Sequence, residues 1–340
     1  MKLLLVTQIV DKDDPILGFF HRWIEEFAKH VESIEVICLK EGKHELPSNV
    51  RVHSIGKEQG GGNAVLYSIR FLYLVWMLRK EYEKVLVHMN PEYVVLAGCF
   101  WKLWHKPIRL WYNHPHAGVR LAIASVFSDI IFHTSAYAAP AHLRKAKCMP
   151  AGIDVDVFKP QAVTRNRHLM YMQGRIMPSK RVAIALQALR ILRKNIPDVT
   201  LMLVGPEDPV YGASLRKEYA DLVESGAVLF KGSVPNHETP LLYSGAGVSI
   251  NLATSGHFDK SVLESMACGT PVVISSKAFA NLVPEEWIVS ENDPQALADG
   301  VGRMMGISDA EFEALQQKGI EVVQKAQSLK ALSEMLIKAL

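Results

Sequence analysis

Two cations flank a short turn in the segment Gly174-Arg175-Ile176-Met177-Pro178-Ser179-Lys180. The segment follows an apolar stretch expected to be a strand (168–173) and precedes an expected helix (181–195). Free backbone amides, the positive end of the helix dipole and the charges of Arg175 and Lys180 together suit an anion such as a diphosphate. A solvated basic loop is the alternative, and Pro178 argues against it because it pre-orders the turn.

A second candidate site lies in residues 254–273, where a small-residue loop leads into a helix start and then into Gly-Thr-Pro and a new strand. Such an arrangement offers another cradle of backbone amides. Glu264 within it has two interpretations. It stands three residues after Ser261, the spacing of a capping box, or it accepts hydrogen bonds from the vicinal hydroxyls of a ribose.

These segments resemble the nucleotide-binding domain of retaining GT-B glycosyltransferases of family four. The resemblance covers most of residues 146–275 and is specific as an ensemble. The family pattern G-R-x-x-x-x-K is matched by Gly174, Arg175 and Lys180, and L-E-A-M-A-C-G-x-P-V-V is matched by residues 263–273, with Ser265 where alanine is usual. The interdomain pattern P-x-G-I-D-x-x-x-F-x-P is matched by residues 150–160.

The resemblance implies a nucleoside diphosphate sugar, UDP- or GDP-linked, as the donor substrate, with no other cofactor. Arg175 and Lys180 would hold its diphosphate, Glu264 its ribose, and amides near Val234 its base.

The resemblance also implies roles for residues of the first half. Gly18 and Phe19, expected in the loop after the first strand, would approach the phosphate or the acceptor. His114 would lie near the point of sugar transfer and is a predicted catalytic residue, with His116 two residues on as its competitor.

One position departs from the family pattern. Two glutamates eight positions apart are usual, but Gly256 stands eight residues before Glu264. We therefore expect Asp259, as a catalytic residue, together with His257 and Lys260 to contact the donor sugar instead.

No metal site is predicted. Transfer from such a donor builds negative charge on the leaving diphosphate, and Arg175, Lys180 and the helix amino termini can stabilise that charge without a metal ion. The Asp154-x-Asp156 triplet coincides with the interdomain pattern, which favours a linker role. The histidines show no metal-ligand spacing such as H-E-x-x-H.

Short apolar strands alternate with helical segments along the chain, which predicts an α/β protein of two Rossmann-like doubly wound domains facing across a cleft, the GT-B architecture. Strands are expected at 2–6, 34–39, 50–55, 84–89, 108–112 and 129–133, and then at 168–173, 199–204, 227–230, 247–251 and 271–275. Helices are expected between the first two strands and at 181–195, 212–225, 261–268 and 328–340.

The domain boundary is expected where this pattern is interrupted, in the region of residues 149–168. We assign residues 1–158 to an N-terminal domain on the acceptor side and residues 159–325 to a C-terminal domain on the donor side. Residues 326–340 form a final helix that can pack on either domain, including a crossing back to the first.

Composition restricts the compartment and the partners. With 340 residues, 49% hydrophobic and 21% charged, the chain is an ordinary globular protein, and its net charge of +3 gives no basis for nucleic-acid binding. Four scattered cysteines and a short N-terminal apolar run predict a cytoplasmic protein. Residues 64–82 are apolar with basic side chains, so they form either a core-facing helix or a peripheral membrane contact.

The predicted function is therefore a metal-independent, retaining glycosyltransferase that moves a sugar to the hydroxyl of a glycan or lipid-linked acceptor. One alternative is a nucleotide-sugar 2-epimerase of the same fold, which would form product without an acceptor. Another is a non-catalytic nucleotide-sugar-binding subunit, which would bind donor without turnover. A nicotinamide dehydrogenase is disfavoured because no G-x-G-x-x-G follows the first strand.

Overall fold

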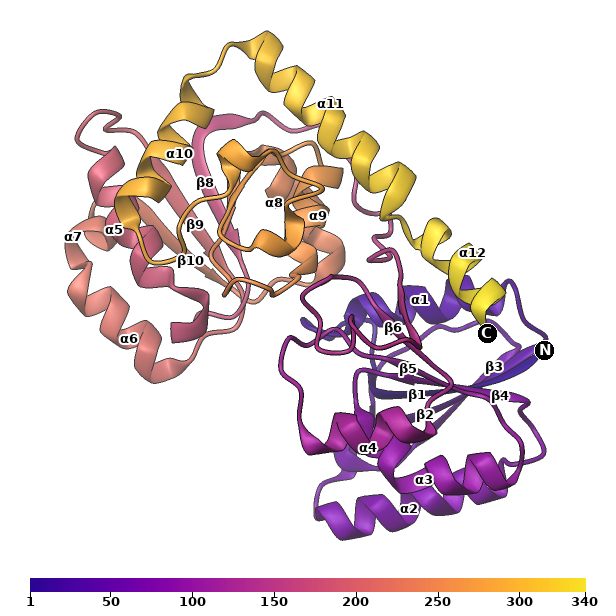
Figure 1. Ribbon diagram of the computed structural model, residues 1–340. Coiled ribbons are helices and arrows are strands. Elements are labelled where there is room, and N and C mark those ends of the chain that lie inside the picture. Colours follow the sequence, from indigo (N-terminus) through magenta and orange to yellow (C-terminus); the bar gives the residue numbers. More distant parts are fainter. The chain divides into compact units, whose positions relative to one another are not determined.

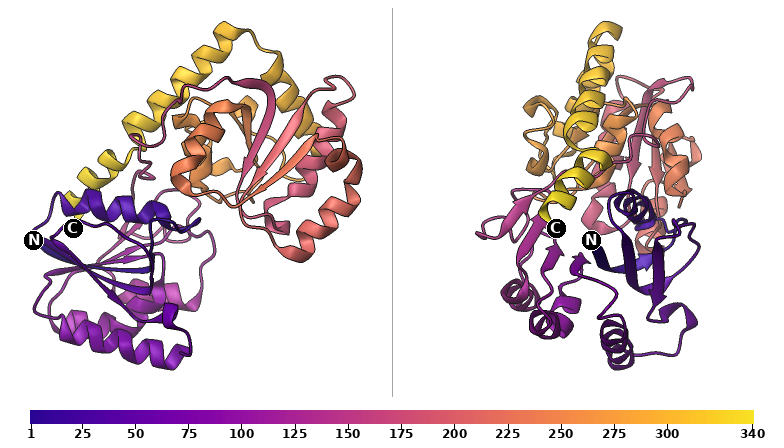
Figure 2. Two further views of the ribbon diagram at one scale, coloured as in Figure 1. Left: turned by 180° about the vertical axis from the view of Figure 1, so that it is seen from behind. Right: turned by 90° about the vertical axis from the view of Figure 1, so that its right-hand side faces the viewer.

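The computed structural model describes residues 1–340 and divides them into two compact units (Figure 1). The first unit comprises residues 1–152 and 329–340, and the second comprises residues 153–328. The observed division lies six residues before the predicted boundary at 158 and three residues after the one at 325. Both chain ends belong to the first unit, where they lie near each other in both views of Figure 2.

The first unit is built on a seven-stranded parallel sheet in the order β3-β2-β1-β4-β5-β6-β7. Its strands are β1 (Lys2–Val10), β2 (Ser33–Glu41), β3 (Val50–Ser54), β4 (Lys84–His88), β5 (Ile108–Trp111), β6 (Ile130–His133) and β7 (Ala146–Cys148). Its helices are α1 (Gly18–Ala28), α2 (Ala64–Met77), α3 (Pro91–Leu103), α4 (Val119–Phe127) and α12 (Leu329–Ala339), with a 3-10 turn η1 (Lys57–Gln59).

Helices cover both faces of this sheet, as alternation along β1 requires. Leu3 and Leu5 are fully buried in a core shared with α1 and α12, whereas Leu4 and Val6 are fully buried in a second core shared with α2, α3 and α4. Figure 1 shows α1 and α12 on one side of the sheet and α2, α3 and α4 on the other. The continuous apolar run of β1 is thus explained by burial on both faces.

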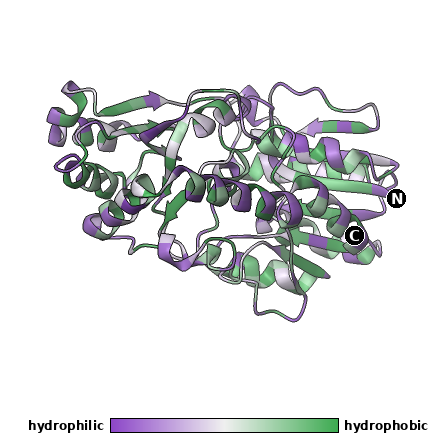
Figure 3. Ribbon diagram, turned by 90° about the horizontal axis from the view of Figure 1, so that it is seen from above, coloured by the Kyte–Doolittle hydropathy of each residue, from purple (hydrophilic) through white to green (hydrophobic).

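The second unit is built on a five-stranded parallel sheet in the order β10-β9-β8-β11-β12. Its strands are β8 (Asn166–Gln173), β9 (Thr200–Val204), β10 (Val228–Gly232), β11 (Ala246–Asn251) and β12 (Val272–Ile274), and the strands of both sheets are largely hydrophobic (Figure 3). Its helices are α5 (Val182–Leu192), α6 (Pro209–Glu218), α7 (Ala220–Glu224), α8 (Thr239–Gly245), α9 (Lys260–Ala267), α10 (Pro294–Gly306) and α11 (Asp309–Ala326). Four 3-10 turns complete it: η2 (Pro178–Lys180), η3 (Asn236–Glu238), η4 (Lys277–Phe279) and η5 (Glu285–Trp287).

Two predictions about local structure are wrong. The helix expected at 212–225 is two helices, α6 and α7, separated at Tyr219, whose φ of −115° and ψ of 34° leave the helical region. Gly18 and Phe19 do not lie in a loop but are the first two residues of α1, because the carboxylate of Asp14 accepts hydrogen bonds from the amides of Ile16 and Leu17 just before that helix begins.

The order of strands places a switch point in each sheet. In a doubly wound sheet the connections leave in opposite directions on either side of the first strand, so ligands bind at the carboxyl ends of that strand and its later neighbour. In the first unit these strands are β1 and β4, and in the second they are β8 and β11. The second switch point therefore brings together the loops that follow Gln173 and Asn251, the two segments the sequence singles out.

Candidate functional site

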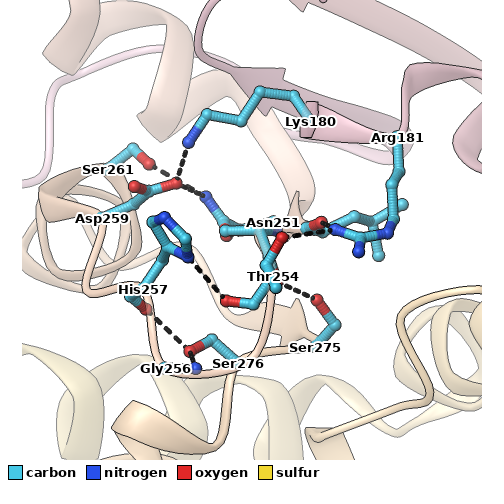
Figure 4. Close-up of polar contacts among 12 residues, drawn as sticks. Lys180, Arg181, Asn251, Thr254, Gly256, His257, Asp259, Ser261, Ser275 and Ser276 are labelled. Atoms are coloured by element: carbon cyan, nitrogen blue, oxygen red, sulfur yellow. Dashed lines mark hydrogen bonds and ion pairs between the residues drawn. The ribbon is translucent and has the colours of Figure 1, made fainter. Parts of the chain in front are cut away.

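A network of polar side chains joins the two loops at the β8/β11 switch point (Figure 4). Lys180, in η2, places its Nζ 2.5 Å from Oδ2 of Asp259, which lies just before α9. Asn251, the last residue of β11, donates from Nδ2 to the same oxygen at 3.0 Å and to Oγ of Ser261 at 3.3 Å. The predicted diphosphate residue Lys180 and the predicted sugar residue Asp259 therefore lie in direct contact.

The electrostatics of Asp259 follow from this contact. Burial alone would raise the pKa of its carboxyl, but the charge of Lys180 and the hydrogen bonds from Lys180 and Asn251 outweigh that effect and lower the pKa below its ordinary value. Asp259 is thus ionised at neutral pH, and the lysine beside it is held in a fixed position.

Arg181, the residue after Lys180, fixes the neighbouring loop. Its guanidinium donates to the carbonyl of Leu252 at 3.1 Å and to Oγ1 of Thr254 at 3.2 Å, and also binds Glu291 and Asn292. Arg181 has a left-handed backbone, with φ of 53°, which turns the chain into α5. Sequence reasoning missed this residue, although a third cation directly after Lys180 was the visible signal.

Gly256 has the backbone conformation that only glycine adopts readily. Its φ is 95°, its amide donates to Oγ of Ser276 at 3.2 Å, and the residue is buried. The same hydroxyl donates to the carbonyl of His257 at 2.7 Å. The loop is therefore shaped for glycine at this position, and a glutamate here would need a strained backbone or a different path of the chain.

His257 lies in the turn of this loop. Its backbone amide donates to the carbonyl of Thr254 at 3.0 Å, and Nδ1 of its ring is 3.2 Å from the same oxygen. Figure 4 shows the ring next to Asp259. The predicted sugar-binding residues His257 and Asp259 thus share one side of the loop.

Glu264 is buried in the interior of α9 and does not cap that helix. The helix begins at Lys260 after Asp259, so Ser261 is its second residue, and the expected capping box is absent. Instead the hydroxyl of Tyr243 donates to Oε2 of Glu264 at 3.2 Å. The capping interpretation is therefore wrong.

Glu264 also interacts electrostatically with Lys260, one helical turn earlier, whose Nζ is buried. Burial raises the pKa of Glu264 to about 7 despite the opposing effects of the Lys260 charge and the Tyr243 hydroxyl, and burial lowers the pKa of Lys260. A carboxylate held so far from water gains from any additional hydroxyl donors, as ribose would supply.

Arg175 is exposed and makes no hydrogen bond or ion pair with another residue. The residue before it, Gly174, lies close to Gly205. A Cβ added to Gly205 would be only 2.1 Å from the carbonyl oxygen of Gly174. The loops after β8 and β9 thus meet backbone to backbone at a glycine with φ of 141°. Because it is exposed, the Arg175 guanidinium is available to an external anion.

Val234 lines a cavity of about 610 Å³ in the second unit, beside the loop that follows β10. Polar and charged side chains share the lining, among them Lys159, Lys231, His237 and Glu238. The cavity is large enough for a nucleobase with its sugar, so a ligand near Val234 has room in this unit.

In the first unit, the start of α1 faces the β1/β4 switch point. Phe19 packs edge-to-face on the ring of His88, the last residue of β4, with centroids 6.3 Å apart. A Cβ on Gly18 would come within 2.9 Å of the Lys12 carbonyl, so the loop after β1 closes tightly on this glycine. Gly18 and Phe19 are therefore placed at the ligand-binding end of the sheet.

His114 lines a separate cavity of about 540 Å³ in the first unit. The backbone amide of His116 donates to Nδ1 of His114 at 3.3 Å, and the two exposed rings have centroids 5.3 Å apart. Both histidines belong to the lining, together with Glu92 and Arg120, which form an ion pair at 2.7 Å. Geometry therefore does not distinguish His114 from His116. No group of three or more histidine, cysteine, aspartate or glutamate side chains is arranged to hold a metal ion.

Comparison with known proteins gives a family match within the second unit and several more distant relatives. Residues 167–306 match the family described as glycosyl transferases group 1. A D-inositol 3-phosphate glycosyltransferase of Acidothermus cellulolyticus is 28% identical over 181 residues, covering 47% of this chain and 40% of that protein. An MMP alpha-(1->4)-mannosyltransferase of Mycolicibacterium hassiacum is 28% identical over 241 residues, covering 66% of this chain and 56% of that protein. The first of these alignments spans less than half of the relative.

Solved structures match the whole chain. The Anabaena protein HepE, in complex with UDP, has a TM-score of 0.79 at 16% identity, covering 100% of this chain and 99% of that one. Sucrose-phosphate synthase from Thermosynechococcus elongatus has a TM-score of 0.76 at 20% identity, covering 100% and 98%. These likenesses show the fold, which is the GT-B fold. The match to the family described as glycosyl transferases group 1 lies within the second unit, at residues 167–306.

Proposed function

We propose that this protein is a retaining, metal-independent glycosyltransferase that moves a sugar from a UDP- or GDP-sugar to an acceptor hydroxyl. The observation that carries the proposal is the contact between Lys180 and Asp259 at the β8/β11 switch point, inside the segment that matches the family. It joins an anion-binding cation to a carboxylate suited to sugar hydroxyls, at the edge where such sheets bind ligands.

The donor would bind through its charges first. Arg175 and Lys180, with the N-terminal amides of α5 and α9, offer positive charge to the diphosphate, and this charge matters most as the phosphate leaves. The diphosphate competes with Asp259 for Lys180. Its arrival would therefore release the Asp259 carboxylate toward the donor sugar, with His257 and Lys260 alongside.

The remaining roles complete the donor and transfer sites. Glu264 accepts hydrogen bonds from the ribose, and the loop at Val234 receives the base. The leaving phosphate oxygen takes the proton of the acceptor hydroxyl as the new bond forms on the same face of the sugar, while His114 orients a sugar hydroxyl. Gly18 and Phe19 contact the phosphate or the acceptor.

The acceptor would be a glycan or a lipid-linked molecule, and no nucleic acid is involved. A relative from Mycolicibacterium smegmatis, 27% identical over 181 residues, is named a GDP-mannose-dependent alpha-(1-6)-phosphatidylinositol monomannoside mannosyltransferase, which supports a lipid-linked acceptor. Four free cysteines support a cytoplasmic location, and the first unit would provide a peripheral contact with the membrane.

One observation favours a second candidate, a non-catalytic nucleotide-sugar-binding subunit. Gly256 replaces the first glutamate of the family pattern, and its φ of 95° shows that the loop is built around glycine. A protein of this kind would retain the diphosphate and ribose contacts but transfer no sugar.

Thermal denaturation with UDP, GDP, ADP, CMP and their sugars, with and without EDTA, tests the proposal. Stabilisation by one nucleoside diphosphate, unchanged by EDTA, is the expected result, because a ligand that binds only the folded state raises Tm. Incubation of the selected donor with glycan and lipid-linked acceptors then separates the two candidates. Binding without transfer to any acceptor would favour the subunit, and no stabilisation by any nucleotide would refute the donor site.

A further inference from the structure

The carboxylate of Glu264 is held from inside the protein by a tyrosine. Tyr243, in α8, donates from its hydroxyl to Oε2 of Glu264 at 3.2 Å. Tyr243 is fully buried, and Glu264 is 6% exposed. The hydrogen bond therefore joins two polar groups that water hardly reaches, so each depends on the other for a partner.

Several contacts hold the Tyr243 side chain in one position. Its ring packs on the ring of Tyr171, with centroids 4.8 Å apart, and edge-to-face on the ring of Phe158, with centroids 6.4 Å apart. Its backbone carbonyl accepts from Oγ1 of Thr270 at 2.6 Å. A side chain packed in this way keeps its rotamer, so the fold itself fixes the position of the Tyr243 hydroxyl.

Packing alone does not require a hydroxyl at this position. Phenylalanine would fill the same space, and burial of a hydroxyl costs free energy unless the group is hydrogen-bonded. Burial raises the pKa of the Tyr243 hydroxyl well above its ordinary value, so the group keeps its proton and acts as a donor. The specific contribution of this hydroxyl is thus its bond to Glu264.

The bond to Tyr243 leaves the carboxylate able to accept more. An ionised carboxylate can accept about four hydrogen bonds, and Tyr243 supplies one of them, at Oε2. The two vicinal hydroxyls of a ribose need two further acceptor positions. A glutamate side chain has several rotatable bonds, and a fixed donor at its tip removes much of that freedom before a ligand arrives.

The hydroxyl also affects the protonation of the carboxylate. The titratable groups that interact with Glu264 are Lys260, Asp259, Tyr171, Tyr243 and Cys268. Burial raises the pKa of Glu264 to about 7, against the lowering effects of the Lys260 charge and the Tyr243 hydrogen bond. Without the hydroxyl one of the lowering effects is lost, so the pKa of Glu264 would rise further.

We infer that Tyr243 is the positioning residue of the ribose site: its buried hydroxyl holds Oε2 of Glu264, so that the carboxylate meets both hydroxyls of the ribose already aligned. The inference rests on the proposed function, which supplies the ribose. Because Tyr243 is fully buried, it acts on the donor only through Glu264.

A comparison of two nucleotides tests this role in the full chain. One is the nucleoside diphosphate selected by thermal denaturation, and the other is its 2′,3′-dideoxy analogue, which lacks both ribose hydroxyls. Each is titrated by calorimetry into the unaltered protein and into Tyr243→Phe, which keeps the ring and its packing. Affinity for the nucleoside diphosphate should fall about fivefold to tenfold, the effect of one hydrogen bond, and affinity for the analogue should stay unchanged.

The pH profile of binding adds a readout that a purely structural role would not move. Ribose hydroxyls donate to the ionised carboxylate, so binding strengthens as Glu264 loses its proton. Because Tyr243→Phe removes a donor to the ionised form, the midpoint of this rise should move to higher pH, by about half a pH unit or more. The analogue carries the same diphosphate and so corrects for the titration of the phosphate itself.

The matched control is Tyr219→Phe, the same change at a tyrosine that is 1% exposed between α6 and α7. It should alter neither the affinity nor the pH profile. Equal losses of affinity for the nucleotide and its analogue in Tyr243→Phe would show a structural role and overturn the inference, as would an unchanged affinity for the nucleotide. Failure of the proposed function gives a different result, because no nucleotide would then bind the unaltered protein, and the inference would be overturned with it.

Discussion

At the scale of single residues, the candidate site consists of charges that are already paired before a ligand arrives. Asp259 accepts from both Lys180 and Asn251, so the ammonium is ordered and little entropy is lost when an anion replaces the carboxylate. Arg175, by contrast, has no partner in the protein. The two cations should therefore contribute to affinity in different ways. Lys180 exchanges its ion pair with Asp259 for one with the phosphate, whereas Arg175 forms a new ion pair.

Replacing either cation tests the phosphate assignment. Lys180→Ala and Arg175→Ala should each weaken nucleoside diphosphate binding by about 1.5 to 3 kcal/mol, the range for hydrogen bonds to charged groups. Isothermal titration calorimetry measures the effect, and Lys217→Ala, at an exposed cation of α6 in the same unit, serves as control. Unchanged affinity in both variants would exclude a diphosphate at this turn.

The pKa of Glu264 predicts how nucleotide binding depends on pH. Ribose hydroxyls donate to an ionised carboxylate, and burial raises the pKa of this group to about 7. Binding therefore strengthens as pH rises, by about tenfold in Kd between pH 6 and 8 for a group that must ionise with such a pKa. Titrations across that range measure the effect, and Glu264→Gln should bind weakly with no such rise; a parallel rise in the variant would assign the pH dependence to another group.

A substitution at Gly256 tests whether this position of the loop can accept the glutamate of the family pattern. With φ of 95°, Gly256→Ala should reduce the free energy of unfolding of the second unit by about 1 to 2 kcal/mol. Chemical denaturation provides the measurement, with Gly306→Ala as control, since no atom lies within 4 Å of a Cβ there and its φ is not positive. A neutral Gly256→Ala would show that the loop relaxes and that a glutamate could be accommodated.

At this scale the sequence predicts the chemistry of a residue from its type, and the assigned roles stay predictions. Lys180 and Asp259 were assigned as a cation for phosphate and a carboxylate for sugar, and the structure brings them into contact. Glu264 could not be resolved, because the S-x-x-E spacing fits both a cap and a helix interior. Because α9 begins at Lys260, Ser261 lies inside the helix and Glu264 does not cap it, whereas its ribose contact stays a prediction.

At the scale of elements, eleven of the twelve strands were predictable because they are short runs rich in apolar residues. The exception is β7, which has only three residues and is largely exposed. The helices α3 and α4 were not predicted, since they are apolar almost all round and show no clear helical period. The break between α6 and α7 at Tyr219 was also hidden, because the buried Tyr219 ring and the Arg190 guanidinium stacked on it act through tertiary structure. The amphipathic helices α10 and α11 were also not predicted.

The loop between β11 and α9 is an element whose order depends on one side chain. Arg181 binds it at Leu252 and Thr254, so Arg181→Met should increase amide hydrogen exchange in residues 252–258 by about tenfold or more, the effect of two lost hydrogen bonds. Donor-sugar affinity should fall with it. Arg190→Met, which removes an exposed ion pair with Asp221, is the control and should leave exchange in this loop unaltered.

At the scale of the whole molecule, the C-terminal helix ties the end of the chain to its beginning. Leu332 and Leu336 of α12 are fully buried in the core that includes Trp23 and Phe27 of α1. The guanidinium of Arg109, on β5, donates to the carbonyls of Ala339 and Leu340. The sequence predicted the helix from its apolar stripe but left open which domain it joins, because an apolar stripe does not identify its partner.

Leu336→Ala measures how much α12 contributes to the first unit. Loss of a fully buried leucine should reduce the free energy of unfolding of that unit by about 2 to 5 kcal/mol. Calorimetry should show one transition shifted to lower temperature, with the nucleotide-dependent transition of the second unit unchanged. Met335→Ala, at a partly exposed neighbour, should shift neither; equal shifts of both transitions would show that the units unfold as one.

The second unit is an insertion within the first. The chain leaves the first unit at Gly152 and re-enters it at Leu329, and these crossings run side by side, with the amide of Ile153 donating to the Gln327 carbonyl at 2.9 Å. During synthesis the ribosome therefore delivers every residue of the second unit before the last twelve of the first. The C-terminal unit can complete its fold while the N-terminal one still lacks a helix, which reverses the usual order in which domains mature.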